Sequence, residues 1–281
     1  MLFGLCTGDL ERMAALRGWG YDYAEIGART VVPFEPDAAW HARRRQLRDT
    51  GVPITHLAGF IPAEARFVGP DVDWGRVRGY LETCIGRAAE VGVRTFNWGS
   101  PQSKSVPAGW PYAKAFEQIE RAAHLIADVM EPLGCTAAIE AINPRECNVI
   151  YYLTDAVQVA SSVNRPQIRI NADYFHMALQ NEPWEHVDAA RDWLAHAHTS
   201  GPDRHFPKPD DPWDHAAFLR ALRRIGYDRA LSFECSRIPP GADYAEEARA
   251  GVAYIRTLYE QVAREYAPSP RAPTRSPGDD P

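Results

Sequence analysis

Four residues of metal-ligand type lie at or near the ends of four successive apolar segments in the second half of the chain. They are Glu140 in TAAIEAI, Asp173 in IRINAD, His198 in LAHAHTS and Glu234 in ALSFEC. A carboxylate in an apolar strand is costly unless it is paired or coordinates a cation, so the four together predict one shared divalent-metal site. Three carboxylates and one imidazole suit Mn²⁺ first, with Mg²⁺, Co²⁺ and Zn²⁺ as the alternatives.

The spacing of these residues is that of repeated strand and helix units. Each interval between consecutive members is about the length of one strand, helix and loop, which places them on consecutive strands of a parallel barrel. Along the whole chain, short β-type runs alternate with amphipathic helical segments about eight times. The sequence therefore predicts an α/β fold, a single (β/α)8 TIM barrel that occupies residues 1–266.

The predicted elements follow from this alternation. The predicted strands are LFGLCTG, YDYAEIGA, PITHLAGF, RTFNWGS, TAAIEAI, QIRINAD, AHAHTS and ALSFEC. The predicted helices span residues 9–18, 37–50, 73–91, 114–133, 154–164, 183–195, 214–225 and 243–265. Two Pro/Gly-rich segments, 61–73 and 99–114, are longer than ordinary connections after strands, so we expect them on the catalytic face. The tail, 267–281, is Pro-rich and polar and is predicted to be disordered.

Composition excludes several classes of protein. The chain has 281 residues, 45% of them hydrophobic and 24% charged, and one barrel of roughly 250 residues uses nearly all of that length. The formal net charge of -6 argues against a nucleic-acid surface. Five scattered cysteines without a CxxC pair indicate neither a disulfide framework nor a zinc-thiolate site. No segment approaches the ~18 apolar residues of a membrane span, and no basic leader precedes the first strand, so we expect a cytoplasmic protein.

A second polar group accompanies three of the four candidate ligands. Glu146, His176 and Arg204 each follow a strand end and share the same loop surface, where they suit the hydroxyl groups of a polyhydroxy substrate. His196 shares the strand face of His198 and is either a neighbour of the ligand or the ligand itself. We favour His198 because it lies nearer the carboxyl end of its strand.

Weaker candidates for lining the pocket come from the first half of the chain. Glu25 and His56 lie near strand ends, and Lys104 and Trp110 lie in the long loop after the fourth strand. Trp184 lies in an aromatic-rich segment that either packs internally or joins two copies of the chain, so the sequence is compatible with a homodimer.

The segments IEAINPRECNVI, NADYFHM, AHTSGPDRHFP and SFEC together resemble the sugar isomerase/epimerase family of xylose isomerase-like TIM barrels, which includes ketose 3-epimerases and inosose-processing enzymes. The resemblance covers essentially the whole folded chain. It implies a carbohydrate substrate, with oxygens contacted by Glu146, His176 and Arg204. It also implies proton transfers by Glu140 and Glu234 from opposite faces of the substrate carbon.

The chain departs from the family pattern in two places. Relatives commonly read Glu-Pro-Leu-Asn-Arg where this chain reads EAINP, so the proline moves and Arg145 comes one position late. Lys104 lies near a place where relatives often carry arginine.

The resemblance and the ligand set favour a metal-dependent carbohydrate isomerase or epimerase that acts through a metal-stabilised enediolate. Returning the proton to the opposite face gives epimerisation, and returning it to the neighbouring carbon gives isomerisation. A lyase or dehydratase that eliminates from a keto-sugar, keto-glycoside or inosose at the same site is the enzymatic alternative. A sugar-binding barrel without turnover is the non-enzymatic one. A nuclease is disfavoured by the acidic net charge and by the small number of additional histidine ligands.

Overall fold

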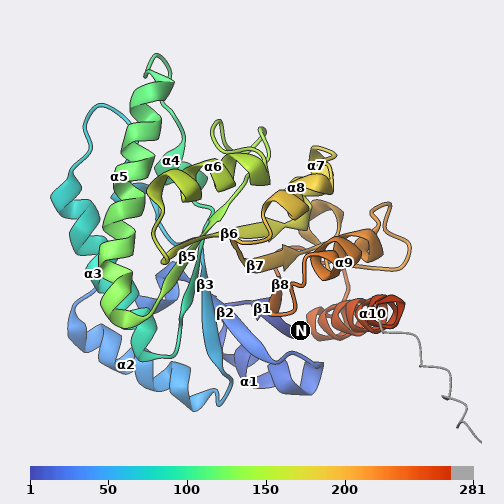
Figure 1. Cartoon of the computed structure of the whole chain (residues 1–281). Helices are drawn as coiled ribbons and strands as arrows, with labels where there is room; N and C mark the ends of the chain where they lie inside the picture. Colours follow the sequence, from blue (N-terminus) through green and yellow to red (C-terminus); the bar gives the residue numbers. More distant parts are fainter. Residues whose placement is uncertain (267–281) are drawn as a thin grey trace, which may run out of the picture.

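The computed structural model describes residues 1–266, in which eight parallel strands close into a barrel surrounded by helices (Figure 1). The strands follow one another in chain order, and the last pairs with the first. Their bounds are β1 Leu2–Cys6, β2 Tyr23–Gly27, β3 Ile54–Ala58, β4 Thr95–Trp98, β5 Thr136–Glu140, β6 Ile168–Asp173, β7 Leu194–Thr199 and β8 Ala230–Phe233. The predicted eight-stranded α/β barrel is therefore confirmed, and the predicted tail, 267–281, lies outside the described residues.

Helices follow the strands and form the outer layer. Their bounds are α1 Leu10–Trp19, α2 Asp37–Asp49, α3 Trp74–Glu90, α4 Pro101–Lys104, α5 Tyr112–Met130, α6 Leu153–Val163, α7 Tyr174–Leu179, α8 Glu185–Ala189, α9 His215–Arg224 and α10 Tyr244–Glu265, with short 3-10 turns η1 Ala28–Val31, η2 Ala63–Ala65, η3 Glu131–Leu133 and η4 Pro202–Arg204. Four helices begin after an aspartate whose side chain accepts a hydrogen bond from the backbone N–H three residues later: Asp9, Asp73, Asp214 and Asp243. These caps satisfy an amide that the helix itself leaves free. No helix within residues 1–266 is both long and apolar enough to cross a bilayer.

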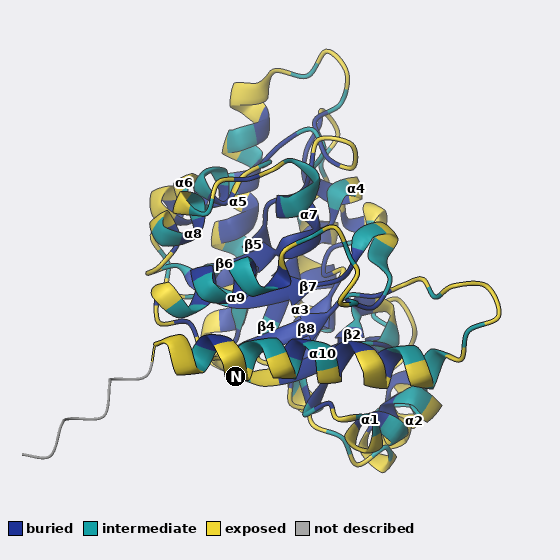
Figure 2. Ribbon diagram, turned by 90° about the vertical axis from the view of Figure 1, so that its right-hand side faces the viewer, coloured by how far each residue is buried: buried dark blue, intermediate teal, exposed yellow. Residues whose placement is uncertain are grey.

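The apolar core lies between the strands and the helices. Strand residues such as Ile26 and Leu57 are fully buried in one cluster with helix residues such as Met13 and Ile85. In Figure 2 the strands are mostly dark blue, whereas the colour of α10 alternates between blue, teal and yellow along the helix, because only some of its residues are buried. Parallel strands must be covered on both faces, and this helical layer provides the outer cover.

The inner face of the barrel carries hydrogen-bonded polar side chains, whereas such barrels are usually filled by branched apolar residues. The Asn171 amide donates to Asn97 Oδ1 at 3.2 Å and to Glu140 Oε1 at 2.9 Å. The Tyr23 and Ser232 hydroxyls lie 2.7 Å apart. Because these buried groups are paired across strands, their desolvation is compensated and their orientations are fixed.

The main departure from the predicted elements concerns the stretch 183–195. The structure forms only the short helix α8 there, and β7 begins at Leu194. The backbone N–H of Ile170 in β6 bonds to the carbonyl of Trp193, so sheet pairing ends the helix early. Two short helices were also missed: α4, within the long loop 99–114, and α7, directly after β6. Tertiary pairing outweighs local helical propensity in such short segments.

Candidate metal centre and adjoining cavity

The four predicted ligands converge at the carboxyl ends of neighbouring strands. Glu140 and Asp173 end β5 and β6, His198 lies near the end of β7, and Glu234 directly follows β8. Each offers one ligand atom, and these atoms all lie within 4.8 Å of one another. The first three are buried and Glu234 is partly exposed. This acidic cluster lies at the end of the barrel where such folds place their active sites.

Two polar atoms of the acidic cluster are buried without a hydrogen-bond partner: Asp173 Oδ2 and His198 Nδ1. The other carboxylate oxygen of Asp173 accepts from the backbone N–H of Phe175 at 2.8 Å. Burial, together with the nearby Glu140 and Glu234 charges, raises the pKa of Asp173 to about 6. Buried ligand-type atoms without hydrogen-bond partners, together with three carboxylates at one point, are what a divalent cation would satisfy, so these residues fit a metal ion.

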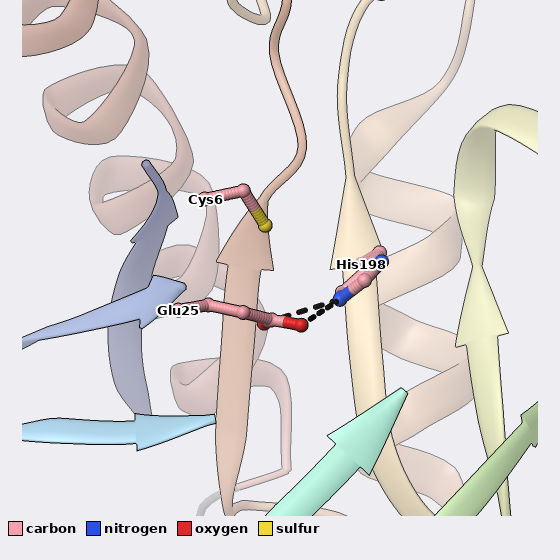
Figure 3. A group of neighbouring side chains, drawn as sticks. All are labelled: Cys6, Glu25 and His198. Carbon is pink, nitrogen blue, oxygen red and sulfur yellow. Dashed lines mark hydrogen bonds and ion pairs between the residues drawn. The ribbon is translucent and has the colours of Figure 1, made fainter. Parts of the chain in front are cut away.

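Glu25 holds the His198 ring from below. Its two carboxylate oxygens lie 3.1 and 3.2 Å from His198 Nε2, and one of them lies 2.8 Å from His196 Nε2. Figure 3 draws the contacts between Glu25 and His198 as dashed lines. Burial alone would raise the pKa of Glu25, but the two imidazoles hold it well below its ordinary value. An ionised Glu25 accepts N–H from His198 Nε2, and Nδ1 faces the acidic cluster. Although burial opposes it, Glu25, Glu140 and Glu234 raise the pKa of His198 well above its ordinary value, and a cation bound at Nδ1 would displace the proton there. His196 binds Glu25 instead of joining the acidic cluster.

Cys6 adjoins Glu25 and His198, and these three residues also bring their possible ligand atoms within 4.8 Å of one another (Figure 3). Burial raises the pKa of the Cys6 thiol well above its ordinary value, and the Glu25 charge acts in the same direction. The thiol is therefore protonated at neutral pH, and we treat it as a neighbour of the acidic cluster.

Glu140 is positioned from three sides. Asn171 donates to one carboxylate oxygen, and the Lys104 ammonium donates to the Glu140 backbone carbonyl at 2.8 Å. Gly99, which directly follows β4, allows the other oxygen to approach its backbone: a Cβ at Gly99 would lie 2.1 Å from Glu140 Oε2. Real Cβ contacts are never this short, so any side chain at position 99 must displace the carboxylate.

We expect Gly99→Ala to weaken metal binding by about tenfold or more, because the Glu140 carboxylate loses its place. Isothermal titration with Mn²⁺ measures this effect directly. Gly86→Ala in α3 is the matched control, since a Cβ there meets open space and metal affinity should stay at the wild-type value. Equal Mn²⁺ affinity in both variants would show that Glu140 does not need its present position.

A cavity of about 660 Å³ opens above the acidic cluster. Its lining includes Glu140, Glu234 and the three predicted substrate contacts Glu146, His176 and Arg204. The sequence prediction did not include other lining residues: Arg29, Glu64, Asn97, Gln102 and Ser236. A volume of this size is typical of small-molecule sites.

The other three predicted pocket residues lie elsewhere. His56 is inside the barrel, where its ring stacks on His196 at 4.2 Å, and it faces a cavity at the opposite end. Lys104 is fully buried beneath Glu140. Trp110 packs on α5, where its ring N–H donates to Gln118 at 3.1 Å. The lining of the 660 Å³ cavity includes none of the three.

Arg204 links the predicted substrate contacts to the acidic cluster. It forms an ion pair with Glu234 and lies 3.1 Å from His176 Nε2, while its guanidinium stacks over the Phe175 ring at 4.1 Å. Asn143 fixes the other His176 nitrogen at 2.7 Å. Although burial opposes ionisation, Arg204 lowers the pKa of Glu234 to about 2, so this carboxylate is charged at neutral pH.

Comparison with known proteins identifies the family. A family model described as "Xylose isomerase-like TIM barrel" matches residues 13–258. The chain belongs to this family. The curated relatives of this xylose isomerase-like barrel include D-psicose 3-epimerase from Ruminiclostridium cellulolyticum, 23% identical over 235 residues that span 80% of this chain and 76% of the relative. They also include ketose 3-epimerase from Arthrobacter globiformis, 28% identical over 110 residues, or 39% of this chain and 38% of that protein.

Solved structures share the fold of this xylose isomerase-like barrel. D-psicose 3-epimerase crystallised with D-fructose superposes with a TM-score of 0.81 at 19% identity, covering 92% of this chain and 99% of that one. The 3-keto-D-glucoside 4-epimerase from E. coli superposes with a TM-score of 0.76 at 19% identity over the same shares. The predicted family and fold are confirmed. At 19% sequence identity these superpositions show a shared fold, whereas the chemistry depends on the residues of this chain.

Proposed function

We propose that the protein is a divalent-metal-dependent carbohydrate epimerase or isomerase that acts on a keto-sugar or related polyol through an enediolate. The observation that carries this proposal is the acidic cluster, with unpartnered Asp173 and His198 atoms, at the base of a cavity lined by polar side chains. The relatives support it, because they are named as epimerases of ketoses and of a 3-keto-glucoside.

The acidic cluster would hold the metal ion, with Mn²⁺ as the first choice and Mg²⁺, Co²⁺ or Zn²⁺ as alternatives. When bound, a divalent cation polarises a carbonyl, acidifies the adjacent C–H and stabilises the negative charge that develops on oxygen. Glu25 contributes by holding the His198 ring, and Gly99 by leaving room for Glu140.

Glu140 and Glu234 are the proposed proton-transfer groups. Despite burial, the His198 contact lowers the pKa of Glu140, and Arg204 with His198 lowers that of Glu234, so both are carboxylates at neutral pH. One removes the proton next to the carbonyl. If the other carboxylate takes up a proton from solvent in the cavity and delivers it to the opposite face, the centre is inverted; if the first returns its own proton to the neighbouring carbon, aldose and ketose are exchanged.

Glu146, His176 and Arg204 are the proposed substrate contacts. Arg204 offers guanidinium N–H donors, and Glu146 offers carboxylate acceptors to sugar hydroxyls. The Asn143 contact fixes the His176 ring so that its Nε2 points toward Arg204. Together they would set the orientation of the carbon chain relative to Glu140 and Glu234.

Proton–deuterium exchange in D₂O tests the proposal. The protein is incubated with ketoses, keto-inositols and 3-keto-glycosides, with and without Mn²⁺, and products are identified by NMR and mass spectrometry. Metal-dependent deuterium next to a carbonyl, with an epimer or isomer as product, is the expected result. Loss of a substituent would instead identify an elimination, and stoichiometric metal with no exchange across the panel would favour a sugar-binding barrel.

A further inference from the structure

A second, smaller cavity continues from the 660 Å³ cavity over the loops that follow β2 and β3. It measures about 400 Å³ and shares four lining residues with the first: Arg29, Gly59, Pro62 and Glu234. A molecule held at the acidic cluster can therefore extend into this second cavity without leaving the binding site.

The lining of the second cavity is largely apolar. Its remaining members are Gly27, Ala28, Pro33, Phe34, Ala58 and Tyr80. Of all its lining residues, only Arg29 and Glu234 carry charged side chains, and Arg29 is already paired with Glu64 at 3.0 Å. The Tyr80 hydroxyl donates to the Phe60 carbonyl, so it is also occupied. A second sugar ring would find few free hydrogen-bond partners here, whereas an apolar group would not need them.

Phe34 presents an aromatic surface to this cavity. Its side chain is 49% exposed, although large apolar side chains are normally covered. The ring stacks on Tyr80 with 5.4 Å between centroids and 29° between planes. A flat ring placed on the exposed side of Phe34 would extend this stack.

The segment that carries Phe34 is held firmly from below by a buried arginine. Arg87 in α3 donates to the carbonyls of Val32 and Glu35, the latter at 2.9 Å, and pairs with Asp37 at 2.9 Å. Tyr80 and Arg87 lie two turns apart on α3, so one helix supports both the stacked ring and its loop. The exposed aromatic ring is therefore preorganised, which lowers the entropic cost of binding a ligand.

We propose that this second cavity, lined by Phe34, Tyr80, Pro33 and Pro62, binds the aryl aglycone of a keto-glycoside whose sugar ring lies at the acidic cluster. The inference rests on the proposed function and narrows its substrate class from keto-sugars in general to glycosides with an apolar, flat aglycone. The continuity of the two cavities and the lack of free polar groups in the second are what support it.

Matched probes test this inference. Mn²⁺-loaded protein is titrated calorimetrically with phenyl 3-keto-glucoside and with methyl 3-keto-glucoside, which share the sugar and differ in the aglycone. We expect the wild type to bind the phenyl probe about tenfold more tightly, and Phe34→Ala to lower that ratio to near one. Tyr112→Ala removes an aromatic side chain that is 53% exposed on α5, and it should keep the wild-type ratio.

The outcomes separate this inference from the proposed function. Equal affinity for the two probes, or an unchanged ratio in Phe34→Ala, overturns the aryl subsite while the epimerase proposal stands. If neither glycoside binds, saturation-transfer NMR with 4-nitrophenol decides: a signal lost in Phe34→Ala supports the aromatic subsite, and a signal that is absent or unchanged overturns it, while the proposed function is tested separately by the exchange panel. A wild-type dimer that Phe34→Ala converts to a monomer, with no change in the ratio, assigns the ring to a subunit interface and overturns the inference.

Discussion

Replacing Glu140 or Glu234 with glutamine is expected to lower the rate of substrate deuterium exchange by about three orders of magnitude. Glutamine keeps nearly the same shape but cannot accept a proton at neutral pH. Each carboxylate is held in its ionised form, Glu140 by His198 and Glu234 chiefly by Arg204. The measurement is the exchange rate in D₂O on whichever panel member the wild type turns over, with metal content determined on the same samples.

Both glutamates also belong to the acidic cluster, so a substitution at either could lower the exchange rate simply by losing the metal ion. Each variant is therefore assayed at Mn²⁺ concentrations that restore full occupancy. Glu265→Gln is the matched control, since Glu265 also pairs with an arginine, Arg220, at 2.8 Å, but lies on the surface. Turnover that survives in either cluster variant with metal bound would refute the assignment of proton transfer to that glutamate.

Removing the metal ion is expected to abolish exchange and to lower thermal stability. Because the acidic cluster belongs to the folded state, a metal ion at a hundredfold excess over its Kd adds about 2.7 kcal/mol to the free energy of unfolding. For a chain of this length that corresponds to a rise of a few degrees in Tm. The measurement compares melting curves and exchange rates before chelation, after chelation and after Mn²⁺ is restored.

Two variants test whether the metal-dependent rise in Tm comes from binding at the acidic cluster. Asp173→Asn removes one charge from it, and we expect the Mn²⁺-dependent rise in Tm to disappear. Asp188→Asn breaks a surface pair with Arg224 at 2.8 Å and should leave the rise intact. A full rise in the Asp173 variant would mean that the stabilising metal ion binds elsewhere on the chain.

Much of the fold could be predicted from periodicity alone. Alternating strand and helix patterns indicated the eight strands. In a parallel barrel each strand is buried on both faces, so it appears in the sequence as a short apolar run between two helical segments. The predicted helix at 183–195 was too long, because helical propensity and strand pairing compete in this segment. Those residues have helical composition, but pairing between β6 and β7 brings the chain back into the sheet at Leu194.

Residues of the candidate site that lie at strand ends could be predicted from the sequence. Residues whose role depends on the direction of their side chains could not. Glu140 and Asp173 follow from the strand register. Lys104 was expected in the cavity, but the short helix α4 turns it beneath Glu140. His56 lies in mid-strand, so it meets His196 inside the barrel. Glu25 is also a carboxylate in an apolar strand, like the predicted ligands. That it contacts His198 across the barrel is visible only in the structure.

The polar inner face of the barrel limits how this protein can be made more heat-resistant. Filling it with leucine or isoleucine in place of Asn171 or Glu25 would improve apolar packing, yet it would free Glu140 and His198 to take other rotamers. Directed evolution for heat tolerance that also selects for turnover should therefore accumulate its substitutions in the outer helices and loops and spare the barrel interior.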